Sequence, residues 1–272
     1  MKTVALGQYY PTGSCLHRMD PRMKVILAVL YIVITFMAKN AAAFGLLLVS
    51  SAVLVTVSRI PWRIVLRAMR PILAIMLFTV IVNVFFVRGE NMLFGWGWLR
   101  IYEEGLYQAA FMVVRIVCLI LGTGMFLTYT TTPIMLTDAL ERLLAPLRVL
   151  HVPVHEFAMM MTIALRFIPT LSEETEKIMT AQKARGADFT SGSLLSRVKA
   201  LIPVLIPLFV SAFRRADDLA TAMECRCYHG GQGRTRMTVL RYGMTDVIAL
   251  VLMLLFGVGL VALNYVPMSF SI

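Results

Sequence analysis

Apolar runs of nearly bilayer length recur along this chain of 272 residues, and they restrict its fold more than any motif does. Hydrophobic residues make up 59% of the sequence and charged residues only 15%, so a water-soluble fold of this size could not bury all of the apolar surface. Five runs predict membrane-spanning helices: 25–38, 41–57, 71–87, 106–128 and 244–265. The sequence therefore predicts an all-α, polytopic membrane protein.

Local signals support the first of these spans. Asp20 followed by Pro21 is typical of an N-cap and the first position of a helix. Lys39 and Asn40 separate the first two runs, which predicts a helical hairpin in place of one overlong helix. The segment 58–70 places arginines at roughly helical spacing and predicts a basic amphipathic segment lying on anionic lipid headgroups.

The distribution of lysine and arginine predicts the orientation of the chain. With the N terminus inside, the inner segments 1–24 and 58–70 hold four basic residues each, whereas the outer loop 88–105 holds two. We therefore expect a multi-pass protein of the plasma membrane with a cytoplasmic N terminus. Most of the net charge of +11 then reflects topology. Because no basic stripe is interleaved with stacking aromatic residues, we expect no nucleic-acid partner.

This topology divides the chain into three predicted regions: an N-terminal membrane region of four spans (1–128), a cytoplasmic region of long helices (129–243) and a C-terminal transmembrane helix (244–272). Within the cytoplasmic region, the segment 133–146 predicts a short amphipathic helix. Pro169, followed by a capping-box spacing, predicts the start of a helix that runs to Gly186. Further along, Pro203 and Pro207 predict a broken helix.

A short motif occurs twice in the cytoplasmic region. The pattern Thr-Ala-x-x-x-Arg begins at Thr180 and recurs 41 positions later at Thr221. Each copy ends in an arginine between small residues: Ala184, Arg185 and Gly186 in the first copy, and Cys225, Arg226 and Cys227 in the second. Such residues can simply cap a helix, but capping alone does not explain the same register at two helix ends. A guanidinium between small neighbours can enter a narrow groove and bind a carboxylate with bidentate geometry. We interpret the two arginine tips as docking points for two matched sockets on a partner.

Several segments carry a family resemblance. They are Gly-Gln-Tyr at 7–9, His-Arg-Met-Asp-Pro-Arg at 17–22, Ala-Leu-Arg-Phe-Ile-Pro-Thr at 164–170, Ala-Gln-Lys-Ala-Arg-Gly-Ala-Asp-Phe at 181–189 and Ala-Met-Glu-Cys-Arg-Cys-Tyr at 222–228. In these segments the chain resembles the CbiQ-like family, the transmembrane T component of energy-coupling factor (ECF) transporters. The likeness covers nearly the whole chain. At the second tip, cysteines replace the alanine and glycine that many members have, and they remain small.

The resemblance implies a scaffold that couples energy in an ATP-driven importer of a vitamin or another micronutrient. The implied partners are two cytoplasmic ATPases of the ATP-binding-cassette (ABC) type, which bind ATP and Mg, and a membrane substrate-binding S subunit. The long cytoplasmic helices are then coupling helices that end in two X-Arg-X tips. The resemblance assigns ATPase binding to the tip residues Ala184, Arg185, Gly186, Cys225, Arg226 and Cys227.

The second coupling helix also carries a stripe of mostly small residues at intervals of three and four. Small residues let two helices approach closely, so this stripe is predicted to contact either the first coupling helix or the S subunit. The residues that we expect to contact the S subunit are Met160, Ala216, Ala220 and Met223.

Other candidate sites are weaker. Cys225, Cys227 and His229 offer three metal ligands but no fourth ligand nearby, so we expect no metal site. No paired catalytic residues occur, and we expect neither an enzyme nor a cofactor bound by this chain. Arg115 lies inside a span, where it could be structural or face the S subunit. An alternative function is the permease subunit of a conventional ABC transporter, but its own translocation pathway would require facing polar residues that the spans nearly lack.

Overall fold

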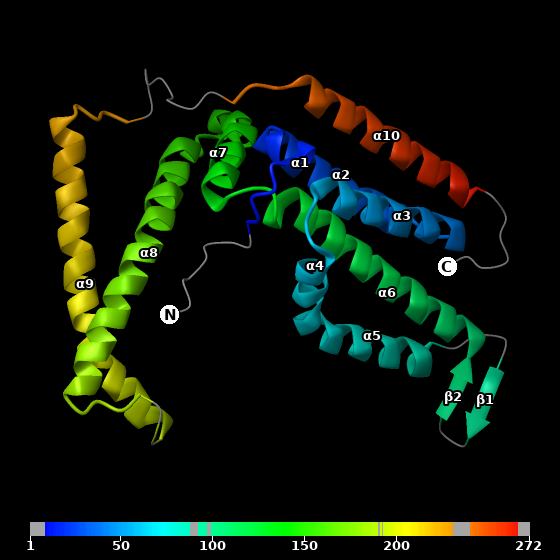
Figure 1. Cartoon of the computed structure of the whole chain (residues 1–272), viewed down its shortest axis with the longest axis horizontal. Helices are drawn as coiled ribbons and strands as arrows, with labels where there is room; N and C mark the ends of the chain where they lie inside the picture. Colours follow the sequence, from blue (N-terminus) through cyan, green and yellow to red (C-terminus); the bar gives the residue numbers. More distant parts are fainter. Residues whose placement is uncertain are drawn as a thin grey trace. The chain divides into compact units, whose positions relative to one another are not determined.

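The computed structural model describes residues 9–87, 92–96, 99–189, 191, 193–230 and 240–265. These residues are almost entirely helical, with one short β-hairpin (Figure 1). The elements in chain order are α1 (Cys15–Arg18), α2 (Pro21–Met37), α3 (Ala41–Ser58), α4 (Trp62–Met69), the 3₁₀-helix η1 (Arg70–Ile72), α5 (Leu73–Phe86), β1 (Met92–Trp96), β2 (Leu99–Tyr102), α6 (Glu103–Thr123), the π-helical turn η2 (Gly124–Thr128), α7 (Pro133–Leu143), the 3₁₀-helix η3 (Ala145–Leu150), α8 (Val154–Ala184), α9 (Leu194–Cys225) and α10 (Met244–Asn264).

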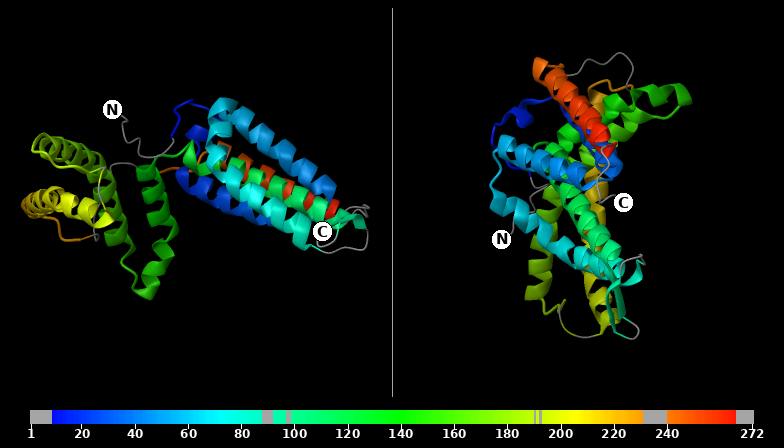
Figure 2. Two further views of the ribbon diagram at one scale, coloured as in Figure 1. Left: turned by 90° about the horizontal axis from the view of Figure 1, so that it is seen from below. Right: turned by 90° about the vertical axis from the view of Figure 1, so that its right-hand side faces the viewer.

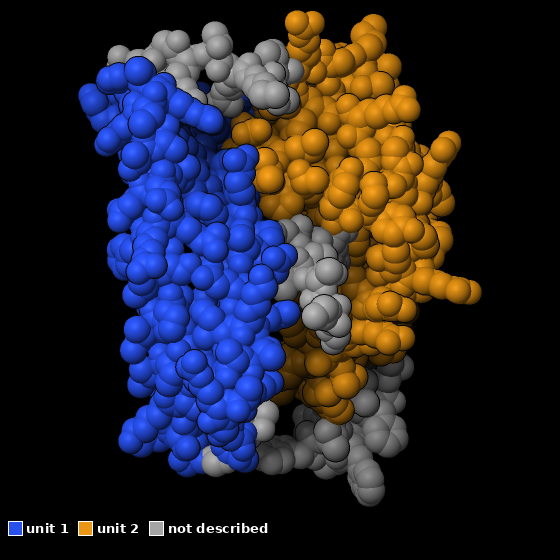
Figure 3. All heavy atoms as spheres, turned by 60° about the vertical axis from the view of Figure 1, so that its left-hand side comes forward, with its two compact units in different colours: residues 1–6, 140–238 blue, residues 7–139, 239–272 orange. Residues whose placement is uncertain are grey.

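The chain divides into two compact units, which Figure 3 colours separately. The core unit comprises residues 7–139 and 239–272, and the arm unit comprises residues 1–6 and 140–238. Helices α8 and α9 belong to the arm unit, and α2, α3, α5, α6 and α10 belong to the core unit. The three regions predicted from the sequence are defined by the side of the membrane on which they lie. The division into two units rests on contacts within the chain, so it does not test those regions.

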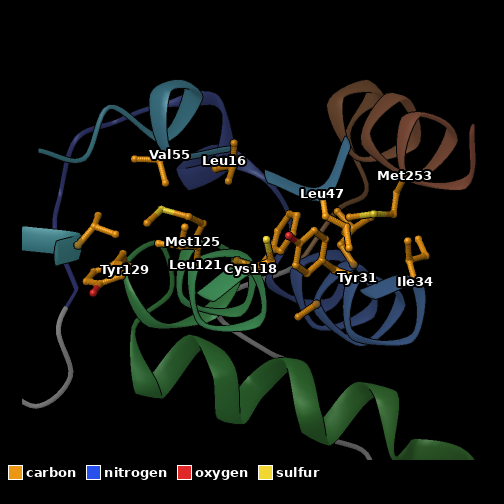
Figure 4. Packing of buried hydrophobic residues seen from close by; sticks show 14 of the residues in the cluster. Leu16, Tyr31, Ile34, Leu47, Val55, Cys118, Leu121, Met125, Tyr129 and Met253 are labelled. Carbon is orange, nitrogen blue, oxygen red and sulfur yellow. The ribbon is translucent and has the colours of Figure 1, made fainter. Parts of the chain in front are cut away.

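Helix α6 organises the core unit. Helices α2, α3 and α5 pack against α6, while α10 packs against α2 and α3, and the helices run side by side along the unit (Figure 2). The side chains at the centre of this packing are buried and apolar (Figure 4): Tyr31, Leu47, Cys118, Met125 and Met253. The Tyr31 hydroxyl is 2.8 Å from the Ser51 hydroxyl, so the one polar group of that ring is satisfied inside the core.

Helix α2 begins as the sequence predicts. The Asp20 side chain accepts a hydrogen bond from the Arg22 backbone N–H at 2.9 Å, and Pro21 is the first residue of the helix. The Arg22 guanidinium returns to the same carboxylate at 2.8 Å. The predicted N-cap is therefore confirmed and is reinforced by an ion pair.

A buried polar cluster joins the start of α2 to the start of α10. The two carboxylate oxygens of Asp246 accept from the backbone N–H groups of Asp20, at 3.0 Å, and Gly243, at 2.8 Å. The Lys24 ammonium donates to the Thr130 carbonyl at 2.8 Å. Asp20, Lys24 and Asp246 are at most 5% exposed. Buried charges require such partners, so this cluster fixes the relative positions of three segments of the core unit.

Five helices of the described chain are long and apolar enough to cross a membrane: Ala41–Ser58, Trp62–Phe86, Glu103–Thr128, Leu195–Cys225 and Met244–Asn264. The prediction of an all-α, polytopic membrane protein is confirmed. The set differs from the predicted spans in three respects. The second candidate begins at Trp62, so it includes α4 from the basic segment 58–70. Helix α2 has only 17 residues, and α9, which the sequence assigns to the cytoplasmic region, also has the length and composition of a span.

Two segments outside the predicted spans have more structure than expected. The basic segment 58–70 contains α4, which buries Val65 and exposes Arg63 and Arg67, as its amphipathic pattern predicts. The predicted loop 88–105 contains the antiparallel hairpin of β1 and β2, with Trp96 paired to Leu99.

The structure corrects the helix boundaries predicted from proline. Pro169 does not start a helix but lies inside α8, which is continuous over 31 residues. Pro203 and Pro207 likewise lie inside α9, which is continuous over 32 residues. A proline removes one backbone hydrogen bond and costs about 3 kcal/mol, but it does not end a helix when the residues on both sides form several uninterrupted turns.

Candidate functional site

The first arginine tip is the C-terminal end of α8. Arg185 caps the helix with φ −87° and ψ 7°, and Gly186 follows in the left-handed region at φ 88°. The Gly186 N–H donates to the Lys183 carbonyl at 3.0 Å, and the Ala187 N–H donates to the Gln182 carbonyl at 3.0 Å. This pair of bonds is a Schellman motif, and the predicted glycine cap is confirmed.

The second arginine tip, at the end of α9, has the same backbone geometry. Arg226 caps the helix with φ −93° and ψ 13°, and Cys227 follows in the left-handed region at φ 55°. The Cys227 N–H donates to the Glu224 carbonyl at 2.8 Å, and the Tyr228 N–H donates to the Met223 carbonyl at 3.0 Å. Each of these residues stands 41 positions after its counterpart in the first tip. The duplicated sequence therefore folds into a duplicated structure.

The arginine side chains are not used by these caps. The bonds of both Schellman motifs are made by backbone N–H groups, so the guanidinium groups take no part in them. Arg185 and Arg226 are exposed, and neither makes an ion pair or a side-chain hydrogen bond among the residues that the structure describes. A helix cap alone does not explain why both guanidinium groups point to the outside.

The neighbours of both arginines leave them accessible. Ala184 and Gly186 are exposed at the first tip, and Cys225 and Cys227 are exposed free cysteines at the second. No side-chain bulk surrounds either guanidinium at its flanks, which is the condition for entering a narrow groove. Beyond the second tip, the Nδ1–H of His229 donates to the Cys227 carbonyl at 2.8 Å.

An ion pair joins α8 and α9, the two arms, at equivalent positions of the repeat. The Arg215 guanidinium on α9 donates to the Glu174 carboxylate on α8 at 2.8 Å, and these residues are 41 positions apart. Each therefore stands eleven residues before the arginine of its own tip. The sequence alone does not predict this link, although opposite charges at the same place in both copies are its signal. Figure 1 shows that α8 and α9 run in opposite directions, so the tips lie at opposite ends of the pair.

The surroundings of Glu174 favour its charged form. A hydrogen bond from the Ser211 hydroxyl, together with the Arg215 guanidinium, lowers the pKa of the Glu174 carboxyl below its ordinary value of 4.5. Ser211 is also 3.5 Å from the Arg215 side chain. The crossing of the arms is thus a small polar contact between long, largely apolar helices.

The residues predicted to contact an S subunit lie on open surfaces of the arms. Met160 on α8 and both Ala216 and Ala220 on α9 are exposed, and Met223 is half-buried. The ion pair between the arms comes from a different position of α9, at Arg215. Ala216 and Ala220 are therefore accessible to another protein, and their role stays a prediction.

Arg115 makes its contacts inside the core unit. Its guanidinium donates to the Ala38 carbonyl at 2.9 Å and lies 5.3 Å from the ring centroid of Phe44. A cation at the carbonyl end of α2 complements the helix dipole, and an aromatic face provides further attraction. Of the two roles that the sequence leaves open, these contacts favour the structural one.

No cluster of three or more histidine, cysteine, aspartate or glutamate side chains that could hold a metal ion occurs in the part of the chain that the structure describes. The candidate site is therefore the pair of arginine tips with the arms that carry them.

Comparison with known proteins agrees with the resemblance seen in the sequence. Residues 12–238 match the family model described as "CbiQ: Cobalt transport protein". The chain is 50% identical to the energy-coupling factor transporter transmembrane protein EcfT of Ruminiclostridium cellulolyticum, over 98% of this chain and 99% of that protein. It is 47% identical to the EcfT proteins of Thermosediminibacter oceani, over 98% of this chain and 100% of the relative, and of Bacillus subtilis, over 92% and 94%. The chain therefore belongs to the CbiQ family of cobalt transport proteins, and its relatives are transmembrane components of energy-coupling factor transporters.

Proposed function

We propose that this chain is the energy-coupling scaffold of an ATP-driven ECF-type importer of a vitamin or another micronutrient, with its N terminus in the cytoplasm of a plasma membrane. Two ABC-type ATPases dock at Arg185 and Arg226, and a membrane S subunit, which binds the substrate, seats on exposed faces of the arms. ATP and Mg are bound by the ATPases and not by this chain. The names of the relatives support the assignment to an ECF transporter.

The observation that carries the proposal is the repeated tip. Two guanidinium groups stand on the same Schellman backbone, 41 residues apart, and are left unused by the caps. Two copies of one docking element fit two related ATPases. The conventional permease has no comparable support, because Arg115, the basic residue inside span α6, is bound to the Ala38 carbonyl.

Charge reversal at the tips tests the docking role. A glutamate would face the carboxylate expected in each socket, which costs roughly 2–5 kcal/mol when the pair is desolvated. We expect Arg185→Glu or Arg226→Glu to weaken ATPase association and uptake, and the double variant to abolish uptake. The measurement is the amount of ATPase that co-purifies with the tagged chain, together with uptake by intact cells at matched expression.

The matched control is Arg214→Glu, since Arg214 is an exposed arginine of α9 that lies away from the tip. This control should retain ATPase and uptake. Normal co-purification and transport in the Arg185→Glu, Arg226→Glu double variant would overturn the docking proposal.

A second variant tests whether the arms transmit motion in addition to anchoring the ATPases. Ala220 is exposed on α9, six residues before Arg226, so Ala220→Trp should disturb a partner on the arm while leaving the tip intact. We expect retained ATPase with reduced uptake. Normal uptake in the same preparation would contradict a transmitting role for this face.

A further inference from the structure

A basic hollow lies in the core unit, at the end of α3. It has a volume of about 470 Å³ and is lined by Gly13, Ser14, Cys15, Arg18, Thr56, Val57 and Arg59. Two of the seven lining residues are arginines and none is acidic. Arg18 and Arg59 are exposed and make no ion pair with any described residue. Two guanidinium groups that have no carboxylate partner among the described residues therefore line the hollow.

The walls of this hollow are held in place by specific contacts. The Thr12 hydroxyl donates to the Ser58 carbonyl at 2.8 Å, which ties the segment before α1 to the end of α3. Ser14 is buried, and its hydroxyl lies 2.7 Å from the His17 ring. The two arginines come from these two connected segments, so their spacing is set by the fold.

Arg59 has a backbone conformation that favours glycine. Arg59 ends α3 in the left-handed region, with φ 56° and ψ 26°. Glycine adopts this conformation without steric cost, whereas other residues adopt it under strain. From this position the Arg59 side chain lines the hollow.

An apolar track leads from the hollow along α3. Val57, Val53 and Val49 follow one another at intervals of four residues, on one face of the helix, and are 44%, 52% and 61% exposed. Helix α3 is long and apolar enough to span a membrane, so we expect this face at acyl-chain depth and the end of the helix at headgroup depth. A free anion would use the arginines but not the track.

We propose that this hollow binds the headgroup of an anionic phospholipid, with the phosphodiester between Arg18 and Arg59 and one acyl chain along Val57, Val53 and Val49. Guanidinium groups bind phosphate oxygens with paired, charge-assisted hydrogen bonds. The site is separate from the arginine tips and does not depend on the proposed function.

The test uses the full chain, purified in a neutral detergent and stripped of lipid. Phosphatidylglycerol is added back, and bound lipid is counted by native mass spectrometry while the midpoint of thermal unfolding is recorded. We expect one tightly bound phosphatidylglycerol and a raised midpoint, with weaker binding of zwitterionic phosphatidylcholine. Each arginine near an anionic headgroup contributes about fivefold in affinity, so Arg18→Gln with Arg59→Gln should weaken binding about 25-fold.

Arg67→Gln with Arg70→Gln is the matched control, because it removes the same charge from α4 and η1, outside the hollow. This control should bind phosphatidylglycerol within about twofold of the parent protein, since screening limits remote charges. Equal losses in both double variants, or parent-like binding by Arg18→Gln with Arg59→Gln, would overturn the site. If that variant does not fold, Arg59→Gln alone carries the test, with an expected loss of about fivefold.

Two further additions separate a lipid from a free anion. Inorganic phosphate in tenfold excess should not displace the lipid, and phosphatidylglycerol with six-carbon chains should bind at least tenfold more weakly, because it cannot reach along the valine track. Displacement by phosphate, or equal binding of the short-chain lipid, would contradict the phospholipid assignment.

Discussion

One set of charged residues in the core unit and one set in the arm unit have opposite surroundings. In the core unit, Asp20, Lys24 and Asp246 are buried, and each is held by hydrogen bonds. In the arm unit, Arg185 and Arg226 are exposed at helix ends that are capped without them. A buried, bonded charge specifies how segments of one chain fit together. An exposed arginine on a repeated backbone motif contributes little to the chain itself, which suits a residue that binds a second protein.

Removing one charge from each unit gives the largest expected contrast. Asp246→Ala removes the acceptor of the buried Asp20 N–H and of the Gly243 N–H, so we expect a loss of roughly 3 kcal/mol in the free energy of unfolding. Arg226→Ala should change it by less than about 0.5 kcal/mol. Denaturant titration in mixed micelles measures both. Comparable losses would remove the distinction between the units.

A glycine in the core tests the packing behind this contrast. A Cβ at Gly122 would overlap the Tyr31 ring, which is itself 1% exposed, so we expect Gly122→Ala to cost about 1–3 kcal/mol. Gly45→Ala is the control, because no atom lies within 4 Å of a Cβ there, and alanine is the better helix former. The midpoint of thermal unfolding should fall for the first variant and hold or rise for the second. An unchanged midpoint for Gly122→Ala would mean that the core can repack.

The two tips should respond in opposite directions to a change in their left-handed residue. Gly186→Ala introduces a Cβ at φ 88° and should destabilise the end of α8 by about 1 kcal/mol. Cys227→Gly relieves the same conformation at φ 55° and should stabilise the end of α9 by a similar amount. Hydrogen exchange of the last turns measures each effect. Shifts of the same sign would show that the tips differ in structure despite their sequence.

The smallest expected effect concerns the contact between the arms. Because the folded-state pKa of Glu174 lies below its ordinary value of 4.5, its contribution is complete above that value and is lost as the pH falls through the folded pKa. Paramagnetic labels at Thr180 and Thr221, in a chain without other cysteines, should report a wider or broader distance distribution below pH 4 than at pH 7. Glu174→Gln should show the broader distribution at both pH values. A parent-like distribution for this variant at pH 7 would exclude the ion pair as the link.

Features carried by local patterns could be predicted from the sequence. Asp20 and Pro21 predict the start of α2, and the repeated Thr-Ala-x-x-x-Arg motif predicts the positions of both tips. Both predictions are possible because capping and helical periodicity depend on nearby residues. The sequence predicts a helix start at Pro169, but α8 continues through this residue, because whether a proline ends a helix depends on the turns around it.

Features that depend on the three-dimensional fold could not be predicted in the same way. The pairing of Glu174 with Arg215 required knowledge that the arms cross, although the repeat placed them in register. Gly186 predicts a left-handed residue after the first tip, because glycine favours that conformation. Cysteine does not favour it, so the sequence does not predict the same conformation at Cys227.

The position of the Glu174–Arg215 ion pair has a mechanical consequence. Because it stands eleven residues before the arginine of each tip, it divides the two arms into free lengths of about 16 Å each. A pivot at this point gives both tips the same radius, so a rotation of about 10° would carry each through an arc of about 3 Å. Equal radii convert one change of angle into equal displacements at the two ends. If α8 and α9 rotate about this contact, we therefore expect the two tips to move by equal amounts.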